Sequence, residues 1–222
     1  MRITIDLKIF LFAIIFIITK QIEFYAILMA YAIIHELGHL LCGVFLRLKP
    51  ETFSITPFGL QISFKPEISL YNSKVKNGTR ICVKKMLLAF AGPLTNILIS
   101  IVLLFIQMDQ NLKQIMIYSN ILVAVFNLIP IYPLDGGRIL KGVIRKKFED
   151  NIKADTIVNK ISNILVIILT AVSSILILYL KNISVLFVII YLWILVIKEN
   201  KRFNLKRKIN NIISKENKCI DI

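Results

Sequence analysis

Apolar residues in this chain gather in long runs, with neither the 3.6-residue spacing of a surface helix nor the alternation of a half-buried strand. Runs of this length are typical of helices that cross a membrane. We therefore predict an all-α polytopic membrane protein with about six transmembrane helices. The predicted spans cover residues 9–19, 24–46, 86–106, 112–131, 161–180 and 185–197.

Composition supports this prediction. Hydrophobic residues make up 57% of the 222 residues and the mean hydropathy is +0.75, whereas soluble domains are about 45–50% apolar. We predict one transmembrane domain over residues 1–198, followed by a basic cytosolic tail over residues 199–222. The first span, which has only 11 residues, is the shortest of the six.

The net charge of +15 is distributed unevenly between the two sides of the predicted membrane domain. When the loops are numbered alternately from the N-terminus, 25 of the 28 lysines and arginines fall on one side, and only Lys20, Lys113 and Lys181 fall on the other. Positive loops face the cytosol, so we predict that both termini are cytosolic. The basic excess is then explained by topology and by attraction to anionic lipid headgroups, and we predict no nucleic-acid partner.

The longest predicted loop, Arg47–Lys85, contains the alternating stretch "ETFSITPFGLQISF". Alternation on both sides of Pro57 and Gly59 predicts a small membrane-associated β-hairpin over Phe53–Phe64. Two interpretations remain open: the hairpin anchors the chain at the membrane surface, or it is an edge strand that pairs with an extended peptide. A second charged segment, Arg138–Lys160, is predicted to be a loop on the same side.

Three polar residues interrupt the second predicted span, in the stretch "YAIIHELGHLLCGVFL". His35 and His39 lie at i and i+4, so both imidazoles occupy one helix face, where they can bind one Zn²⁺. Glu36 can take a proton from water at such a site. The alternative is a pair of histidines that make hydrogen bonds between helices. Cys42 is interpreted as a small apolar side chain in preference to a fourth ligand.

The third ligand is predicted in the segment "NLIPIYPLDGGRIL", just beyond the fourth span. Asp135 is the only carboxylate between residues 110 and 148. Pro130 and Pro133 are incompatible with a regular helix, and Gly136 and Gly137 permit a sharp turn. We expect an unwound segment with Asp135 at its tip. The alternative is an ordinary turn residue.

Together with "FAGPLTNILIS" in the intervening span, these motifs resemble the site-2 protease family of intramembrane zinc metalloproteases, peptidase family M50. The resemblance implies one zinc ion per chain, bound by His35, His39 and Asp135, with Glu36 as the catalytic base of a membrane metalloendopeptidase. It also implies that four residues shape the substrate cleft, namely Asn127, Pro130, Pro133 and Gly136. Pro93 and Asn96 have structural roles in this family, although Asn96 also fits an ordinary hydrogen bond between helices.

The predicted topology points to one branch of that family. No insertion between the two ligand spans is long enough for a PDZ domain, and six spans with cytosolic ends resemble the stage IV sporulation protein FB branch. The roughly 24 residues after Lys198 are too few for the CBS domain often found in that branch. The resemblance implies a membrane-associated protein substrate such as a pro-sigma factor, membrane regulatory proteins, and a bacterial inner or forespore-surrounding membrane.

Two other functions fit parts of the pattern. Another membrane-embedded zincin, acting in protein quality control, would share the HExxH motif but take a downstream glutamate as its third ligand. A non-catalytic membrane scaffold, or a transporter that uses the histidines as a proton relay, would hold no stoichiometric zinc.

Overall fold

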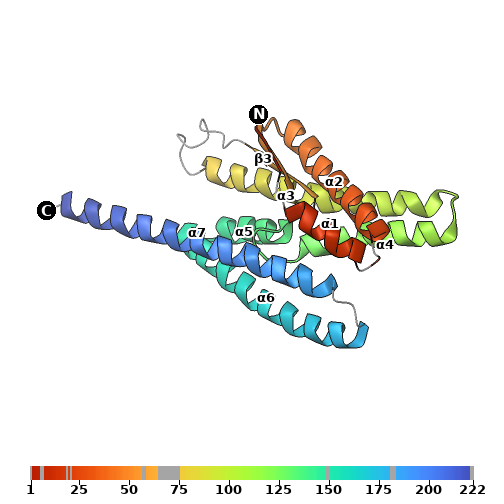
Figure 1. Ribbon diagram of the computed structural model, residues 1–222. Coiled ribbons are helices and arrows are strands. Elements are labelled where there is room, and N and C mark those ends of the chain that lie inside the picture. Colours follow the sequence, from red (N-terminus) through yellow and green to blue (C-terminus); the bar gives the residue numbers. More distant parts are fainter. Residues whose placement is uncertain are drawn as a thin grey trace. The chain divides into compact units, whose positions relative to one another are not determined.

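The computed structural model describes residues 2–5, 8–18, 20, 22–56, 59–64, 76–148, 151–180 and 184–220. The chain divides into two compact units, Met1–Ile129 and Pro130–Ile222. Both units are built mainly from helices, as the apolar runs predict, and the first also contains a small sheet (Figure 1). Each unit is described by itself.

The first unit contains four helices and three strands in its described part. Along the chain they are β1 (Arg2–Ile5), α1 (Lys8–Ile18), α2 (Ile22–Phe45), β2 (Pro50–Thr56), β3 (Gly59–Phe64), α3 (Lys76–Phe105) and α4 (Gln110–Leu128).

Helices α2, α3 and α4 pack together and form the core of the first unit. One residue from each helix, namely Tyr31, Leu103 and Val123, contributes to a common buried cluster. The helix α3 begins ten residues earlier than the predicted span over residues 86–106, so the end of the predicted loop is helical. The polar residues before residue 86 were interpreted as part of a loop, but polar residues can also continue a helix beyond the membrane.

The sheet has the strand order β1-β2-β3. Strands β2 and β3 are antiparallel, with Phe53 opposite Ile62, so the hairpin prediction is confirmed for the described strands. Residues 57 and 58 of its turn lie outside the described part. Strand β1 was not predicted. It pairs in parallel with β2, from Arg2 opposite Thr52 to Ile5 opposite Ile55, and makes a three-stranded sheet with β3 at one edge.

The second unit contains three helices in its described part, α5 (Asp135–Lys147), α6 (Asn151–Leu180) and α7 (Ser184–Ile220). The prediction of a loop over residues 138–160 is therefore wrong, because α5 and the first turns of α6 occupy most of it. Basic residues in the last turn of α5 stabilise that helix through its dipole. They are Arg145, Lys146 and Lys147.

Helices α6 and α7 form an antiparallel pair. The Trp193 indole N–H donates to the Thr170 hydroxyl at 3.0 Å, and the Asn200 amide donates to Asn163 Oδ1 at 2.9 Å. Residue numbers therefore rise along one helix as they fall along the other. The helix α7 continues without interruption past Lys198, the last residue of the predicted transmembrane domain, and runs on beyond the beginning of α6 (Figure 1).

Three helices in the described part of the chain are long and apolar enough to cross a membrane. The qualifying segments are Tyr25–Phe45, Cys82–Phe105 and Ile152–Tyr179. They identify an integral membrane protein. The other three predicted spans are helical over most of their length, although α1 has only 11 residues. That these three helices also cross the membrane stays a prediction.

Candidate metal centre

Helix α2 places the two histidines one turn apart on a single buried face. His35 is 2% exposed and His39 is 4% exposed. Their Nε2 atoms lie 3.2 Å from each other, and the rings meet edge to face. The i and i+4 spacing therefore brings two nitrogens of the ligand type that zinc prefers to one point.

Hydrogen bonds at the opposite side of each ring determine which nitrogen carries the proton. His39 Nδ1 lies 2.7 Å from the Leu88 carbonyl oxygen, and His35 Nδ1 lies 3.0 Å from Asn96 Oδ1. A carbonyl oxygen can only accept, so the Nδ1 atom of each neutral ring must donate. Both Nε2 atoms then present lone pairs.

The orientation of the Asn96 amide supports this assignment. Its Nδ2 donates to Asn120 Oδ1 at 2.8 Å and to the Tyr31 carbonyl at 3.3 Å. Because both partners are acceptors, the nitrogen end of the amide must point to them and the oxygen end to His35. Two facing lone pairs repel each other unless a cation lies between them. Two tetrahedral zinc ligands at ~2.05 Å from the metal are ~3.3 Å apart, and the observed separation fits.

Gly92 in α3 leaves space beside this pair of nitrogens. A Cβ atom at this position would lie 2.5 Å from His39 Nε2 and 2.6 Å from His35 Nε2. The following residue, Pro93, is also buried inside the helix. Because Gly92 has no side chain, space remains beside the two histidines where a metal ion would bind. The two imidazole nitrogens of the first unit fit zinc, which prefers such ligands.

Glu36, the residue next to His35, is half-buried and faces the sheet. Its Oε2 accepts a hydrogen bond from the backbone N–H of Ile62 in β3 at 3.3 Å. The carboxylate thus lies between the histidine-bearing helix and an edge strand of the sheet. A carboxylate in this position can accept a proton while the hydrogen bond from the Ile62 N–H maintains its orientation.

In the second unit, Asp135 is the first residue of α5 and is 5% exposed. Its Oδ1 lies 3.5 Å from the Arg138 guanidinium, one turn along the helix. The expected unwound segment is present over residues 130–134, but Asp135 begins a helix and does not lie at the tip of a turn. The N-terminus of a helix stabilises a carboxylate through its dipole.

The two glycines after Asp135 do not form the predicted turn, because both are helical. At Gly137 a Cβ atom would overlap the backbone of Ile131 and Tyr132. This glycine is therefore required for the close approach of the preceding loop to α5. Gly136 is buried in the same turn.

The remaining predicted cleft residues occupy varied environments. The Asn127 amide donates to the Val123 carbonyl of its own helix at 3.0 Å. Pro130 is exposed, and Pro133 is half-buried after a cis peptide bond with Tyr132. A role in binding substrate stays a prediction for all of them.

His35, His39 and Asp135 are residues that could hold a metal ion. The first two belong to the first unit and the third to the second.

Asn120 was missed by the sequence analysis. An asparagine within the apolar stretch "NILVAV" of α4 was the available signal, because a polar side chain inside a membrane helix usually contacts another polar group.

Comparison with known proteins points to one family. Residues 107–169, which include Asp135, match Peptidase family M50. A zinc metalloprotease of Methanocaldococcus jannaschii is 30% identical over 131 residues, which are 56% of this chain and 35% of that protein. Stage IV sporulation protein FB of Bacillus subtilis is 26% identical over 117 residues, 51% of this chain and 37% of that protein.

A solved structure shares the fold. The site-2 protease from Methanocaldococcus jannaschii has a TM-score of 0.64 and 25% sequence identity to this chain, and the similarity covers 89% of both chains. By contrast, the chain spans only about a third of the length of the two curated relatives that it matches.

Proposed function

Since the chain belongs to the site-2 protease family within peptidase family M50, we propose that it is an intramembrane zinc endopeptidase. His35, His39 and Asp135 hold one zinc ion, and Glu36 is the catalytic base. The observation that carries this proposal is the pair of Nε2 lone pairs 3.2 Å apart, with each ring oriented by a hydrogen bond from its other nitrogen.

Zinc at such a site polarises a carbonyl group and lowers the pKa of water. The chain's own residues then provide orientation and proton transfer. Asn96 Oδ1 and the Leu88 carbonyl accept from the Nδ1 atoms, which leaves both Nε2 atoms directed at the place where the metal would bind. Glu36 Oε2 takes a proton from the attacking water and delivers it to the leaving amine.

The edge strand β3 offers a binding mode for the substrate. A peptide bond inside a helix is shielded by the backbone hydrogen bonds of that helix, so cleavage requires an extended segment. The Ile62 N–H is directed at Glu36, and this edge of β3 therefore faces the catalytic base. We propose that the substrate pairs with β3 and that the hairpin is more than a membrane anchor.

The proposed substrate is a membrane-associated protein cleaved near the cytosolic face. Similarity to stage IV sporulation protein FB supports a pro-sigma factor as substrate, membrane proteins as regulators, and a bacterial inner or forespore-surrounding membrane as location. The excess of basic residues on one side of the predicted spans supports cytosolic termini.

Co-expression with membrane-tethered pro-sigma factors tests the proposed activity. We expect the wild type to cleave the substrate and Glu36→Gln to cleave about 10²–10⁴ times more slowly, the usual contribution of a general base. Glu23→Gln is the matched control, because Glu23 is an exposed carboxylate in the first turn of the same helix. Cleavage by Glu36→Gln at the wild-type rate would show that the proposed mechanism is wrong.

A further inference from the structure

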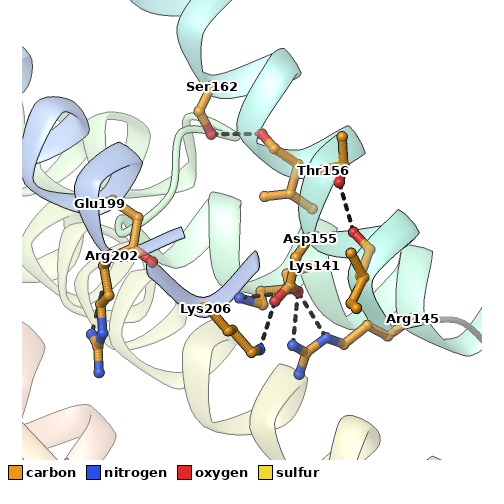
Figure 2. A network of polar contacts seen from close by, with 10 residues as sticks. Lys141, Arg145, Asp155, Thr156, Ser162, Glu199, Arg202 and Lys206 are labelled. Atoms are coloured by element: carbon orange, nitrogen blue, oxygen red, sulfur yellow. Dashed lines mark hydrogen bonds and ion pairs between the residues drawn. The ribbon is translucent and has the colours of Figure 1, made fainter. Parts of the chain in front are cut away.

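A polar pocket of about 250 Å³ lies between the three helices of the second unit. It has room for several water molecules, each of which occupies ~30 Å³ in the liquid, or for a polar group of that size. Charged side chains from α5, α6 and α7 converge there (Figure 2). The lining residues used below are Tyr132, Lys141, Asp155, Glu199, Arg202 and Lys206.

Three cationic groups meet at one carboxylate in this pocket. Asp155 Oδ1 lies 3.2 Å from Lys141 Nζ and 2.7 Å from the Arg145 guanidinium, and Oδ2 lies 2.9 Å from Lys206 Nζ. The Asp155 side chain is only 5% exposed, so these charges are poorly screened by water. One negative charge neutralises only one of the three positive charges.

The second carboxylate of the pocket does not correct this excess. Glu199 is 4.0 Å from Arg202, which is itself a cation, so the pair adds no net negative charge. Arg202 and Lys206 have side chains that are 80% and 60% exposed. Arg202 can therefore turn towards a ligand that enters from solvent, and the exposed Lys206 can donate to the same ligand while it stays beside Asp155.

Burial raises the electrostatic cost of these charges. Desolvation lowers the pKa of Lys141, although Asp155 opposes this effect. Desolvation also raises the pKa of Glu199. A bound anion would stabilise the charged form of Lys141 and lessen the repulsion among the three cations.

The sequences of the surrounding helices indicate the depth of the pocket. The first turns of α6 carry Lys153, Asp155 and Lys160, and the residues after Asn163 are mainly apolar. The apolar part of α7 ends at Ile197, just before Lys198 and Glu199. Both helices thus change from apolar to charged residues at the pocket. Such a change marks the boundary between lipid and water, where phospholipid headgroups lie.

We propose that this pocket binds a phosphate group, with the anionic headgroup of a phospholipid as its source. Lys206 and Arg202 donate from α7 and Lys141 donates from α5. Lys141 Nζ also lies 4.4 Å from the centre of the Tyr132 ring, which keeps the ammonium group at the pocket wall. Basic pockets between membrane helices are established sites for anionic headgroups in proteins generally, and the binding itself does not depend on the proposed protease activity.

Native mass spectrometry of the purified full chain in neutral detergent tests this proposal. Phosphatidylglycerol and phosphatidylcholine are titrated separately. We expect phosphatidylglycerol to bind the wild type more tightly than phosphatidylcholine, and the double variant Arg202→Gln/Lys206→Gln to bind it about tenfold more weakly, since it loses two charge-assisted donors. The matched control is Arg207→Gln/Lys208→Gln, which removes the same charge from exposed positions of α7 outside the pocket.

A variant with the opposite effect keeps the test valid if the double variant is unstable. Glu199→Gln removes a negative charge from the pocket lining, so we expect phosphatidylglycerol to bind several-fold more tightly. A gain of affinity cannot result from unfolding. Equal binding by both double variants, or unchanged binding by Glu199→Gln, would overturn the proposal.

A competition experiment separates the two sources of phosphate. If inorganic phosphate or pyrophosphate displaces phosphatidylglycerol, and Glu199→Gln also tightens their binding, the pocket is a phosphate site open to soluble ligands. If they fail to displace the lipid, the headgroup is the source. Absence of binding by both lipid and soluble phosphate contradicts the proposal and leaves the charge cluster as a structural contact between α6 and α7.

Discussion

The amide of Asn96 orients the imidazole of His35 by accepting the hydrogen of Nδ1 at 3.0 Å. Its own direction is determined by the bond that its nitrogen donates to Asn120 Oδ1 at 2.8 Å. A buried chain of two amides thus links α4 through α3 to His35 of α2, which we propose as a zinc ligand. Partners of this kind determine which ring nitrogen faces the metal.

Replacing Asn96 by leucine should weaken zinc binding. The change keeps the approximate size of the side chain but removes the acceptor for His35 Nδ1, and losses of about 10–100-fold in metal affinity follow removal of such partners. Competition with a chromogenic chelator measures the affinity. Ser100→Ala is the control, since Ser100 is buried one turn further along α3 and its hydroxyl donates to the Asn96 carbonyl. Equal affinity of N96L and the wild type would contradict the assigned orientation.

Gly92→Ala should abolish zinc binding while the helices remain folded. The added methyl group would lie 2.5–2.6 Å from both Nε2 atoms, so it takes the space that a metal ion requires. Zinc content and circular dichroism are measured on the same sample. Full zinc content in the folded variant would show that the ion binds elsewhere.

Gly137→Ala should destabilise the second unit. Its methyl group would overlap the backbone of Ile131 and Tyr132, and backbone atoms cannot move aside as a flexible side chain can. Overpacking of this kind costs about 1–3 kcal/mol. The midpoint of thermal unfolding in mild detergent should fall, and an unchanged midpoint would mean that the loop does not approach α5 so closely.

Asp155→Asn should also lower the midpoint of thermal unfolding. Removing one partner of a buried ion pair costs about 3–5 kcal/mol, and here three cations would lose their shared carboxylate. Glu199→Gln is the comparison, because the ion pair of Glu199 with the exposed Arg202 is long, at 4.0 Å. The midpoint of this variant should change much less. Equal midpoints for D155N and the wild type would show that the network adds no stability.

Ile62→Pro should impair cleavage without loss of zinc. Proline removes the N–H that Glu36 accepts and disturbs pairing along β3. Ile62→Val keeps both and serves as the control. Normal cleavage by I62P would leave β3 as an anchor only. The same substitution at Ile55 in β2 tests the hairpin as a whole.

Local patterns gave the most reliable predictions. The spacing of His35 and His39 on one helix face, and the alternation that forms β2 and β3, depend only on neighbouring residues. Strand β1 was missed because its pairing joins Arg2 to Thr52, and no local pattern reveals so distant a partner. For the same reason the Asn96–Asn120 bond could not be derived from the sequence.

The segment around Asp135 shows the limits of residue preferences. Two prolines correctly predicted an unwound segment after the fourth span, although α4 ends at Leu128 and the predicted span ran to residue 131. Two glycines were wrongly interpreted as a turn. Both are helical, and residue 137 is a glycine because the close approach of Ile131 and Tyr132 leaves no space for a side chain there. The charged residues that followed were interpreted as a loop, yet three of them, Lys141, Arg145 and Asp155, contribute to the ion-pair network of α5, α6 and α7.

The zinc content of the purified chain tests the central claim most directly. In mild detergent, the wild type and Glu36→Gln should each retain about one zinc ion per chain, as expected for a catalytic site with three protein ligands and an open fourth position. His39→Ala and Asp135→Ala should retain almost none, although both remain folded by circular dichroism. Full zinc content in Asp135→Ala, or none in the wild type, would contradict the proposed centre.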